Sequence, residues 1–251
     1  MLLIGGTHLA MDRAPEAVIT IEAWSPQEIH DLGWTTHPST GLDVVGVGEL
    51  VYLLAEEAGG EDVFLYSWSI TSMPAGSAAT LPSLFDMRAH FTPDVEGQYT
   101  IQVTITTATG TSIASVTITA ANYVGVGNIG GADPSFATGQ CAACHGGQAM
   151  EWMQTGHATM FELAIDGLKS SHYNSGCVEC HTAGYDESPL AVNGGFDDVA
   201  DDLGWTFPAT LEDGNWQDIL DNFPELAQLA NIQCENCHGP GSLHKGNAET
   251  T

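Results

Sequence analysis

Basic side chains are almost missing from this sequence of 251 residues. Lysine and arginine together number 4, against 32 aspartate and glutamate residues, which leaves a formal net charge of −28. A surface of this sign repels phosphate backbones and anionic lipid headgroups, so we expect neither a nucleic acid nor a membrane surface as partner. No apolar run approaches the about 20 residues that a membrane-spanning helix needs, and we therefore expect no membrane span.

Cysteine is absent from the first 140 residues, and this half shows the alternation of apolar and polar residues that is typical of strands. Residues 99–106 alternate most regularly, and Gly110 then marks the bend of a hairpin that returns through residues 116–120. Such a set of short strands predicts an antiparallel sandwich. Further strands are expected at residues 17–23, 50–55 and 64–70, the last with Phe64, Tyr66, Trp68 and Ile70 on one face.

Three stretches of this half together suggest a family of domains. They are residues 66–69 (Tyr-Ser-Trp-Ser), residues 74–79 (Pro-Ala-Gly-Ser-Ala-Ala) and residues 91–99. They resemble PKD-type immunoglobulin-like domains of cell-surface proteins, roughly over residues 15–122. The resemblance implies an extracellular adhesive or spacer module in which Tyr99 is the corner tyrosine. A generic β-sandwich with Trp68 as core filler predicts the same fold and no chemistry.

The chain is therefore expected to have two domains, an all-β immunoglobulin-like sandwich and a mostly α-helical or irregular C-terminal module. Residues 148–166 have helical character, and two short helices are expected at residues 213–221 and 224–233, the second with Pro224 at its start. The expected boundaries are an N-terminal extension at residues 1–14, the sandwich at 15–122, a glycine-rich linker at 123–137 and the C-terminal module at 138–251.

The six cysteines form three copies of Cys-x-x-Cys-His, the attachment signature of c-type haem. The two thiols of each copy add to the vinyl groups of one porphyrin, and the adjacent imidazole reaches the iron from one face. One copy can arise by chance, whereas three copies that use every cysteine predict three haem c groups. The covalent ligands are Cys141, Cys144, Cys177, Cys180, Cys234 and Cys237, and the proximal axial ligands are His145, His181 and His238.

Other uses of cysteine explain the pattern less well. Zinc sites use the same ligand types but pair Cys-x-x-Cys units, and three copies with an adjacent histidine do not suit a tetrahedral cage. A disulfide framework leaves the three histidines unexplained, and a thioredoxin-like motif is single and near a βαβ unit.

Covalent haem attachment takes place outside the cytoplasmic membrane, so we expect an exported protein. Its expected place is extracellular or on the cell surface, with the periplasm as the alternative. Residues 1–6 lack the basic leader and the long apolar core of a signal peptide, and we expect export despite this.

The C-terminal half contains three histidines beyond the proximal ones, which equals the number of predicted haems. We therefore predict bis-histidine ligation, with His157, His172 and His244 as distal ligands. His244 follows His238 by six residues, a span of about 20 Å at full extension, so we expect it to ligate a different haem. His172 lies five residues before Cys177, and the same argument applies. Crossed ligation of this kind ties the haems into one compact stack.

Methionine is the competing axial ligand, and Met150, Met153 and Met160 lie in the same stretch as His157. Packing against the core or the porphyrin is the default for these side chains. Four histidines of the N-terminal half are ordinary surface residues in the simplest interpretation and candidate ligands for a neighbouring subunit's haem in a polymer: His8, His30, His37 and His90.

Residues 152–158, 176–184 and 234–244 resemble multihaem cytochromes related to the tetrahaem electron carriers of ammonia oxidation. The last stretch, Cys-Glu-Asn-Cys-His-Gly-Pro-Gly-Ser-Leu-His, is the most specific, and the resemblance covers about residues 138–245. It implies closely packed bis-histidine haems with His157 and His244 as distal ligands. The chain departs from the family because it carries three attachment sites, so the family's fourth haem is expected to be absent.

Residues 197–202 (Asp-Asp-Val-Ala-Asp-Asp) form the sharpest acidic cluster. Such a run is usually a solvated face. Calcium, shared with a haem propionate, is the alternative that we keep as a candidate further cofactor.

Iron bound by imidazole on both faces has no open coordination position, so it exchanges electrons with little geometric change and does not readily bind a substrate. We therefore predict an electron carrier and not an enzyme, with other redox proteins as partners. The enzyme alternative is a small multihaem reductase with one open iron, which requires one distal histidine to be off its iron.

Export, acidity and the fusion of a sandwich to a haem module also suit a subunit of an extracellular conductive filament. Self-association is then expected, with residues 1–14 as a candidate strand for a neighbour's sheet edge. A discrete periplasmic or surface carrier is the alternative. The strong negative charge requires salt or divalent cations at contacts between copies, or a positively charged redox partner.

Overall fold

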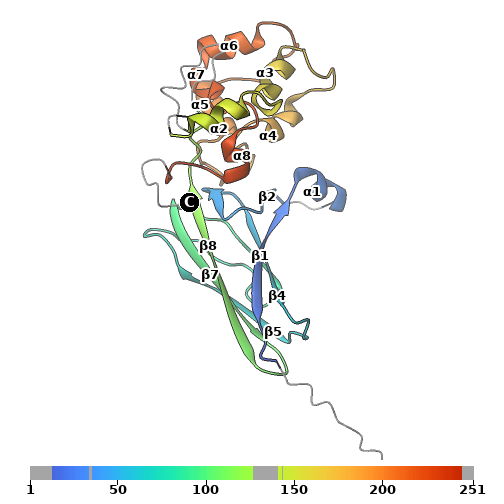
Figure 1. Cartoon of the computed structure of the whole chain (residues 1–251), viewed down its shortest axis with the longest axis vertical. Coiled ribbons are helices and arrows are strands. Elements are labelled where there is room, and N and C mark those ends of the chain that lie inside the picture. The colour runs from blue at the N-terminus through green and yellow to red at the C-terminus, as the bar shows by residue number, and fades with distance from the viewer. Residues whose placement is uncertain (1–12, 34–35, 127–140, 143, 245–251) are drawn as a thin grey trace, which may run out of the picture.

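The computed structural model describes residues 13–33, 36–126, 141–142 and 144–244. Its N-terminal part is a sandwich of two four-stranded sheets, and its C-terminal part consists of short helices joined by irregular segments (Figure 1). The expected sheet-rich half and helical or irregular half are both confirmed. Within the described segments, no helix is long and apolar enough to cross a membrane.

The two sheets of the sandwich have the strand orders β2-β1-β4-β6 and β3-β8-β7-β5. All pairs are antiparallel except β3 with β8, which is parallel. A single short helix, α1 (Pro26–Leu32), follows the first strand and begins with a capping box at Ser25 and Glu28. The strands are β1 (Ala17–Trp24), β2 (Ser39–Thr40), β3 (Val44–Gly46), β4 (Val51–Glu57), β5 (Leu65–Ser72), β6 (Arg88–Phe91), β7 (Gly97–Thr106) and β8 (Thr111–Ala121).

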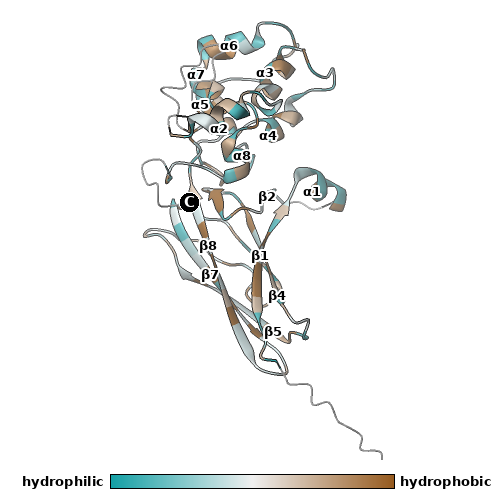
Figure 2. Ribbon diagram, viewed as in Figure 1, coloured by the Kyte–Doolittle hydropathy of each residue, from teal (hydrophilic) through white to brown (hydrophobic). Residues whose placement is uncertain are grey.

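Period-2 alternation builds the sandwich core, as the sequence predicts. Figure 2 shows apolar stretches along the strands, and every second side chain of β4 and β7 is buried. The hairpin between β7 and β8 pairs Thr106 with Thr111, and Gly110 has a positive φ of 151° at its bend. The fully buried positions of β4 and β7 are Val51, Leu53, Ala55, Tyr99, Ile101, Val103 and Ile105.

Tyr99 has the bonding of a corner tyrosine. Its hydroxyl donates to the carbonyl of Val95 at 2.8 Å and accepts the N–H of the same residue at 3.0 Å. Trp68 is buried in the core, and its indole N–H donates to the Asp86 carbonyl at 2.8 Å. Phe64, expected on the same face of this strand as Trp68, lies just before β5 and is 70% exposed.

The C-terminal half contains short helices whose positions follow the expected ones only in part. The stretch expected at residues 148–166 is broken into α2, η2 and α3, and the helix expected at 224–233 ends as α7 at Ala227, with Pro224 in its first turn. The elements are α2 (Gly146–Trp152), η2 (His157–Thr159), α3 (Met160–Ile165), η3 (Ser175–Cys177), α4 (Val178–His181), α5 (Phe196–Leu203), α6 (Asn215–Asn222), α7 (Pro224–Ala227) and α8 (Cys234–His238).

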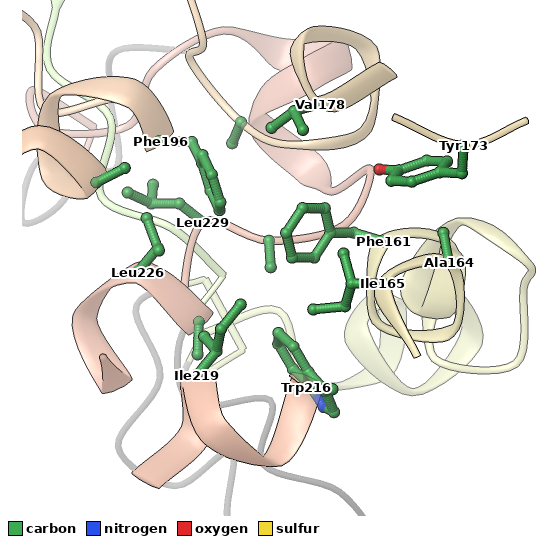
Figure 3. Close-up of a cluster of buried hydrophobic side chains, with 14 of the residues drawn as sticks. Phe161, Ala164, Ile165, Tyr173, Val178, Phe196, Trp216, Ile219, Leu226 and Leu229 are labelled. Atoms are coloured by element: carbon green, nitrogen blue, oxygen red, sulfur yellow. The ribbon is translucent and has the colours of Figure 1, made fainter. Parts of the chain in front are cut away.

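A second hydrophobic core lies among these helices (Figure 3). Phe161 of α3 is fully buried at its centre, with the ring of Phe196 at 5.3 Å and the ring of Trp216 at 6.3 Å, both edge-on. The N–H of Phe161 donates to the side-chain oxygen of Asn231 at 2.8 Å, which satisfies one of the free donors at the start of α3. Asn231 itself is fully buried and has a positive φ of 70°.

The chain that connects the two halves is packed where we expected a linker. Tyr123 is buried, its hydroxyl donates to Glu49 at 2.7 Å, and its N–H donates to the Asn193 carbonyl at 2.8 Å. Val126 is fully buried. The sequence did not predict these contacts, because their partners lie far away along the chain. The remainder of the expected linker lies outside the described residues, as do the first twelve residues of the expected N-terminal extension.

The two halves meet in a close contact that we call the seam, formed by residues 44–49 and 122–125 against residues 190–193 and 235–242. Gly48 has a φ of 84°, and a Cβ at this position would lie 1.8 Å from the Leu190 carbonyl oxygen. A Cβ at Gly239 would lie 2.2 Å from the Val44 carbonyl oxygen. Glycine is therefore required at both positions for the backbones to approach.

Candidate haem-binding region

The three Cys-x-x-Cys-His motifs lie on short helical turns. In the first, the N–H groups of Cys144 and His145 donate to the Cys141 carbonyl at 3.2 and 2.9 Å, just before α2. The second spans η3 and α4, and the third is α8 itself. Residues at positions i and i+3 share one side of a helical turn, so both thiols of a motif face one porphyrin edge. All six cysteines are free, and the second cysteine of each motif is exposed.

The first and third motifs are neighbours in space. The Cys141 side chain is in hydrogen-bond contact with Cys234, and this contact together with burial raises the pKa of the Cys141 thiol. Glu235 is 3% exposed, and its carboxylate accepts the backbone N–H groups of Gly125 and Gly241, each at 2.7 Å. Burial raises the pKa of Glu235. This carboxylate thus holds the start of the third motif against the segment that leaves the sandwich.

The second and third motifs are joined by backbone contacts. Thr182, which follows His181, forms an isolated bridge with Ala230. The side-chain amide of Asn236, inside the third motif, donates to the Thr182 carbonyl at 2.7 Å. The third motif therefore contacts the first motif and the residue that directly follows the second, so the three attachment sites lie close together.

His244 lies opposite the proximal histidine of the first motif. The ring centres of His145 and His244 are 6.0 Å apart, with 22° between the ring planes. A metal–imidazole bond of about 2 Å on each side places the centres of two imidazoles on one metal about 6 Å apart. The Nδ1 atom of His244 is buried without a hydrogen-bond partner among the described residues. This spacing fits two ligands of one haem iron.

The other two distal candidates are exposed and are not stacked on a proximal histidine in the described part of the chain. The His157 carbonyl accepts the N–H of Ile232 at 3.2 Å, and the indole of Trp152 donates to the Ile232 carbonyl at 2.8 Å. His157 is thus anchored just before the third motif. His172 lies in a turn held by the Asn174 amide, which donates to its carbonyl at 2.9 Å.

The second motif has a tyrosine beside its proximal histidine. The rings of Tyr173 and His181 are 5.4 Å apart and nearly parallel, at 9°. Burial lowers the pKa of His181, which favours the neutral imidazole that binds iron. Tyr173 is 7% exposed, and burial raises the pKa of its phenol, so the hydroxyl keeps its proton.

These residues fit haem c. Each motif offers two free thiols and an imidazole, and two of the histidines, His181 and His244, have a buried Nδ1 that no described protein group satisfies. Across the described ranges, no three His, Cys, Asp or Glu side chains are grouped so that they could hold a metal ion.

The acidic run at residues 197–202 is divided between different roles. Asp198 accepts the N–H groups of Asn193 and Gly194 at 2.7 and 2.9 Å, which positions the start of α5. Burial raises the pKa of Asp197 to about 7. Among the described residues, no group of three potential metal ligands is found at this run.

The remaining candidate ligands lie elsewhere. Met150 is 52% exposed, Met153 packs against Ala142 and Ala149, and Met160 packs against the C-terminal core. In the sandwich half, His30 and His37 lie beside Asp31 and Asp186, and the ring of His90 contacts Tyr52, while His8 lies outside the described residues.

Three residues of this region escaped the sequence analysis: Glu49, Tyr173 and Glu235. Glu235 occupies a variable position of its motif, and Glu49 lies two residues before β4, so neither spacing nor periodicity marks them. Glu49 is 7% exposed and accepts the N–H of Gly46 at 2.9 Å, and its pKa is raised by burial. A buried carboxylate is visible only once the two halves are packed together.

Comparison with solved structures gives weak likenesses for the N-terminal half. The solution structure of the PKD domain from KIAA 1837 protein is 22% identical, with a TM-score of 0.22, over 24% of this chain and 59% of that one. The crystal structure of the PKD1 domain from Vibrio cholerae metalloprotease PrtV is 14% identical, with a TM-score of 0.27, over 43% of this chain and 98% of that one.

Sequence comparison gives matches for the C-terminal half. A curated relative, cytochrome c-554 of Nitrosomonas europaea, is 25% identical over 120 residues, which are 43% of this chain and 39% of that protein. The chain thus spans about two fifths of the length of the curated relative that it matches. Residues 140–204 match the model of the family described as cytochrome c554 and c-prime. The matched range contains the first two attachment motifs and ends before the third.

Proposed function

We propose that this chain is an exported electron-transfer protein that carries three covalently bound haem c groups in its C-terminal half. The observation that carries the proposal is the convergence of three complete Cys-x-x-Cys-His motifs, with all six cysteines free. The likeness of residues 140–204 to cytochrome c554 supports the same role. Each haem, when bound, supplies a one-electron couple, and the chain supplies the axial ligands and the burial that set its potential.

We propose the ligand pairs from the residues that lie close together. We assign His145 and His244 to the first iron, on the basis of their 6.0 Å separation. His157 is assigned with His238 to the third iron, because its backbone is bonded to Ile232, next to that motif. Both assignments cross between motifs, and such crossing fastens distant parts of the chain to each other.

The second iron is left with His181 and His172. This pairing uses a distal ligand only a few residues before its own motif, against our expectation of crossed ligation, and the structure leaves His172 exposed. If the protein is a reductase, we therefore expect its open iron at the second site, where an unligated His172 would leave one coordination position free.

Two measurements test the proposal. The intact mass of the mature protein should exceed that of the polypeptide by three haems. Electron paramagnetic resonance should show only low-spin ferric haem, and a high-spin signal in the unaltered protein would favour the reductase. A mass without three haems contradicts the proposal itself.

Substitution of the distal histidines sharpens the test. His244→Ala should convert one haem of three to a high-spin form that binds an added small ligand, because it opens the first iron. His30→Ala is the matched control, since His30 is an exposed histidine of the sandwich. An unchanged spectrum of His244→Ala would contradict the assignment of the first pair.

A polymeric form of the carrier is the second candidate. The observation that favours it is the set of large apolar side chains exposed on and near β5, the last strand of its sheet. A filament of such subunits should be visible by electron microscopy, and salt should promote it by screening the negative charge. Monodisperse monomers at every salt concentration would support the discrete carrier. These side chains are Phe64, Leu65, Leu84 and Phe85.

A further inference from the structure

Two buried polar atoms at the second attachment site have no partner. The hydroxyl of Tyr173 and the Nδ1 atom of His181 are both inaccessible to solvent, and neither has a hydrogen bond to any described residue. The two rings lie against each other, 5.4 Å apart and nearly parallel. Figure 3 shows the Tyr173 hydroxyl directed inward, toward the side on which Val178 lies. Buried polar groups are rarely left unpaired, so this pair needs an explanation.

The chemistry of the two atoms is complementary once His181 binds iron. The metal takes one ring nitrogen, and the other then carries the hydrogen and needs an acceptor, which in metal sites is a carboxylate, a carbonyl or a water. A phenol oxygen accepts a hydrogen bond while its own proton remains free to donate. Burial raises the pKa of Tyr173, so the group stays a neutral phenol.

We infer that Tyr173 is a positioning residue for the second haem: its hydroxyl oxygen accepts the Nδ1–H of His181 across one water, and thereby sets the ring orientation and the basicity of this ligand. The inference rests on the proposed function, because it requires that His181 binds iron. Tyr173 also lies near Cys177 and Cys180, so it belongs to the second attachment site.

The consequence is a difference between the second haem and the other two. A hydrogen bond accepted from Nδ1–H makes the imidazole a stronger donor to iron, which stabilises the ferric state and lowers the reduction potential. Tyr173→Phe keeps the ring that packs on His181 and removes only the acceptor. The variant should therefore raise the potential of one haem and leave the other two unchanged.

The test is a potentiometric titration of the holoprotein. Tyr173→Phe should shift the ferric–ferrous equilibrium of one haem about tenfold toward the ferrous form, which is about 59 mV for a one-electron couple. Tyr185→Phe is the matched control, because Tyr185 packs against the same core but its hydroxyl bonds the exposed Glu187 at 3.0 Å. A second readout is the exchange of the His181 Nδ1–H in the reduced protein by nitrogen-15 magnetic resonance, which should be faster in Tyr173→Phe.

Three unshifted potentials in Tyr173→Phe would overturn the inference, as would an equal shift in Tyr185→Phe. The haem count of each variant, measured first by intact mass, separates this failure from failure of the proposed function. A protein with three haems and unmoved potentials removes only the role of Tyr173, whereas a protein without haem removes the function on which it rests.

Discussion

Away from the seam, where Glu49 is buried, carboxylates in the sandwich and in the C-terminal half are held in contrasting environments. In the sandwich, Glu57 and Glu61 are half-buried and accept hydrogen bonds from nearby backbone and hydroxyl groups, which lower their pKa values. In the C-terminal half, burial raises the pKa values of Glu162, Asp186 and Asp197. The first arrangement stabilises a charged surface, whereas the second places carboxylates where they are partly desolvated.

The same contrast holds for the cores. The sandwich closes its core with its own side chains, and its buried Trp68 and Tyr99 both have hydrogen-bond partners. The C-terminal half has buried unpaired atoms at Tyr173, His181 and His244, beside thiols that face solvent. Among the described residues, the unpaired buried side-chain atoms therefore all lie in the C-terminal half, where a bound group would satisfy those of the two histidines.

The largest expected effect is loss of attachment. Chain produced without the machinery that attaches haem should keep the sandwich transition in thermal unfolding and lose cooperative unfolding of the C-terminal half, because bound groups stabilise only the folded state. Calorimetry with near-ultraviolet circular dichroism measures both transitions. If both unfolding transitions are unchanged without haem, the contrast between the two halves is wrong, since the C-terminal half would then fold without a bound group as the sandwich does.

Core truncations should act separately on the two halves. Phe91→Ala in the sandwich and Phe161→Ala in the C-terminal core each remove a fully buried ring and should each cost roughly 3–5 kcal/mol of the unfolding free energy of their own half. Only Phe161→Ala should alter the visible spectrum. A spectral change of equal size in Phe91→Ala would mean that the halves form one cooperative unit.

The seam can be tested with two glycines that share a backbone conformation. Gly48→Ala and Gly60→Ala each place a side chain at positive φ, which costs about 1–2 kcal/mol in either variant. Of the two new Cβ atoms, only the one at position 48 clashes with another part of the backbone. The Gly48→Ala variant should therefore lose about 1–3 kcal/mol more of its unfolding free energy, because the clash separates hydrogen-bonded groups of the seam such as Tyr123 and Glu49. Equal midpoints in chemical unfolding would show that the seam adds no stability.

The smallest expected effect is the dependence of stability on pH, which should have opposite signs in the two halves. Asp197 has a folded pKa of about 7, above its ordinary 3.8. Its contribution to the unfolding free energy is therefore full below about pH 4 and is lost as the pH rises to about 7. Glu57 has a lowered pKa, so its contribution is present above its ordinary value of 4.5 and is lost in more acidic solution.

Thermal unfolding at about pH 5 and about pH 8 measures the first effect, and Asp197→Asn should flatten the slope of the C-terminal transition. Glu57→Gln should leave that slope unchanged and weaken the sandwich only, because Glu57 lies in β4. A variant Asp197→Asn with the slope of the unaltered protein would place the pH dependence elsewhere.

Much of the architecture could be predicted from local patterns. Alternation located β4 and β7, Gly110 marked the hairpin, and Pro224 marked the start of α7. Phe64 was included in the predicted strand but lies one residue before β5, because alternation assigns a face but not the residue at which a strand begins. The packed segment after Asn122 was missed because its partners, among them Glu49 and Glu235, are far away in the sequence.

The sequence by itself determined which atoms could attach haem, because Cys-x-x-Cys-His is a local motif whose chemistry depends on spacing within one turn. It also determined the charge and the alternating strands, which are likewise properties of neighbouring residues. Only the tertiary structure decided that His244 faces His145, that Tyr173 lies on His181 and that Glu235 anchors the third motif. These are contacts through space between separate segments or turns, and they exist only after the chain has packed its two cores and closed the seam between them.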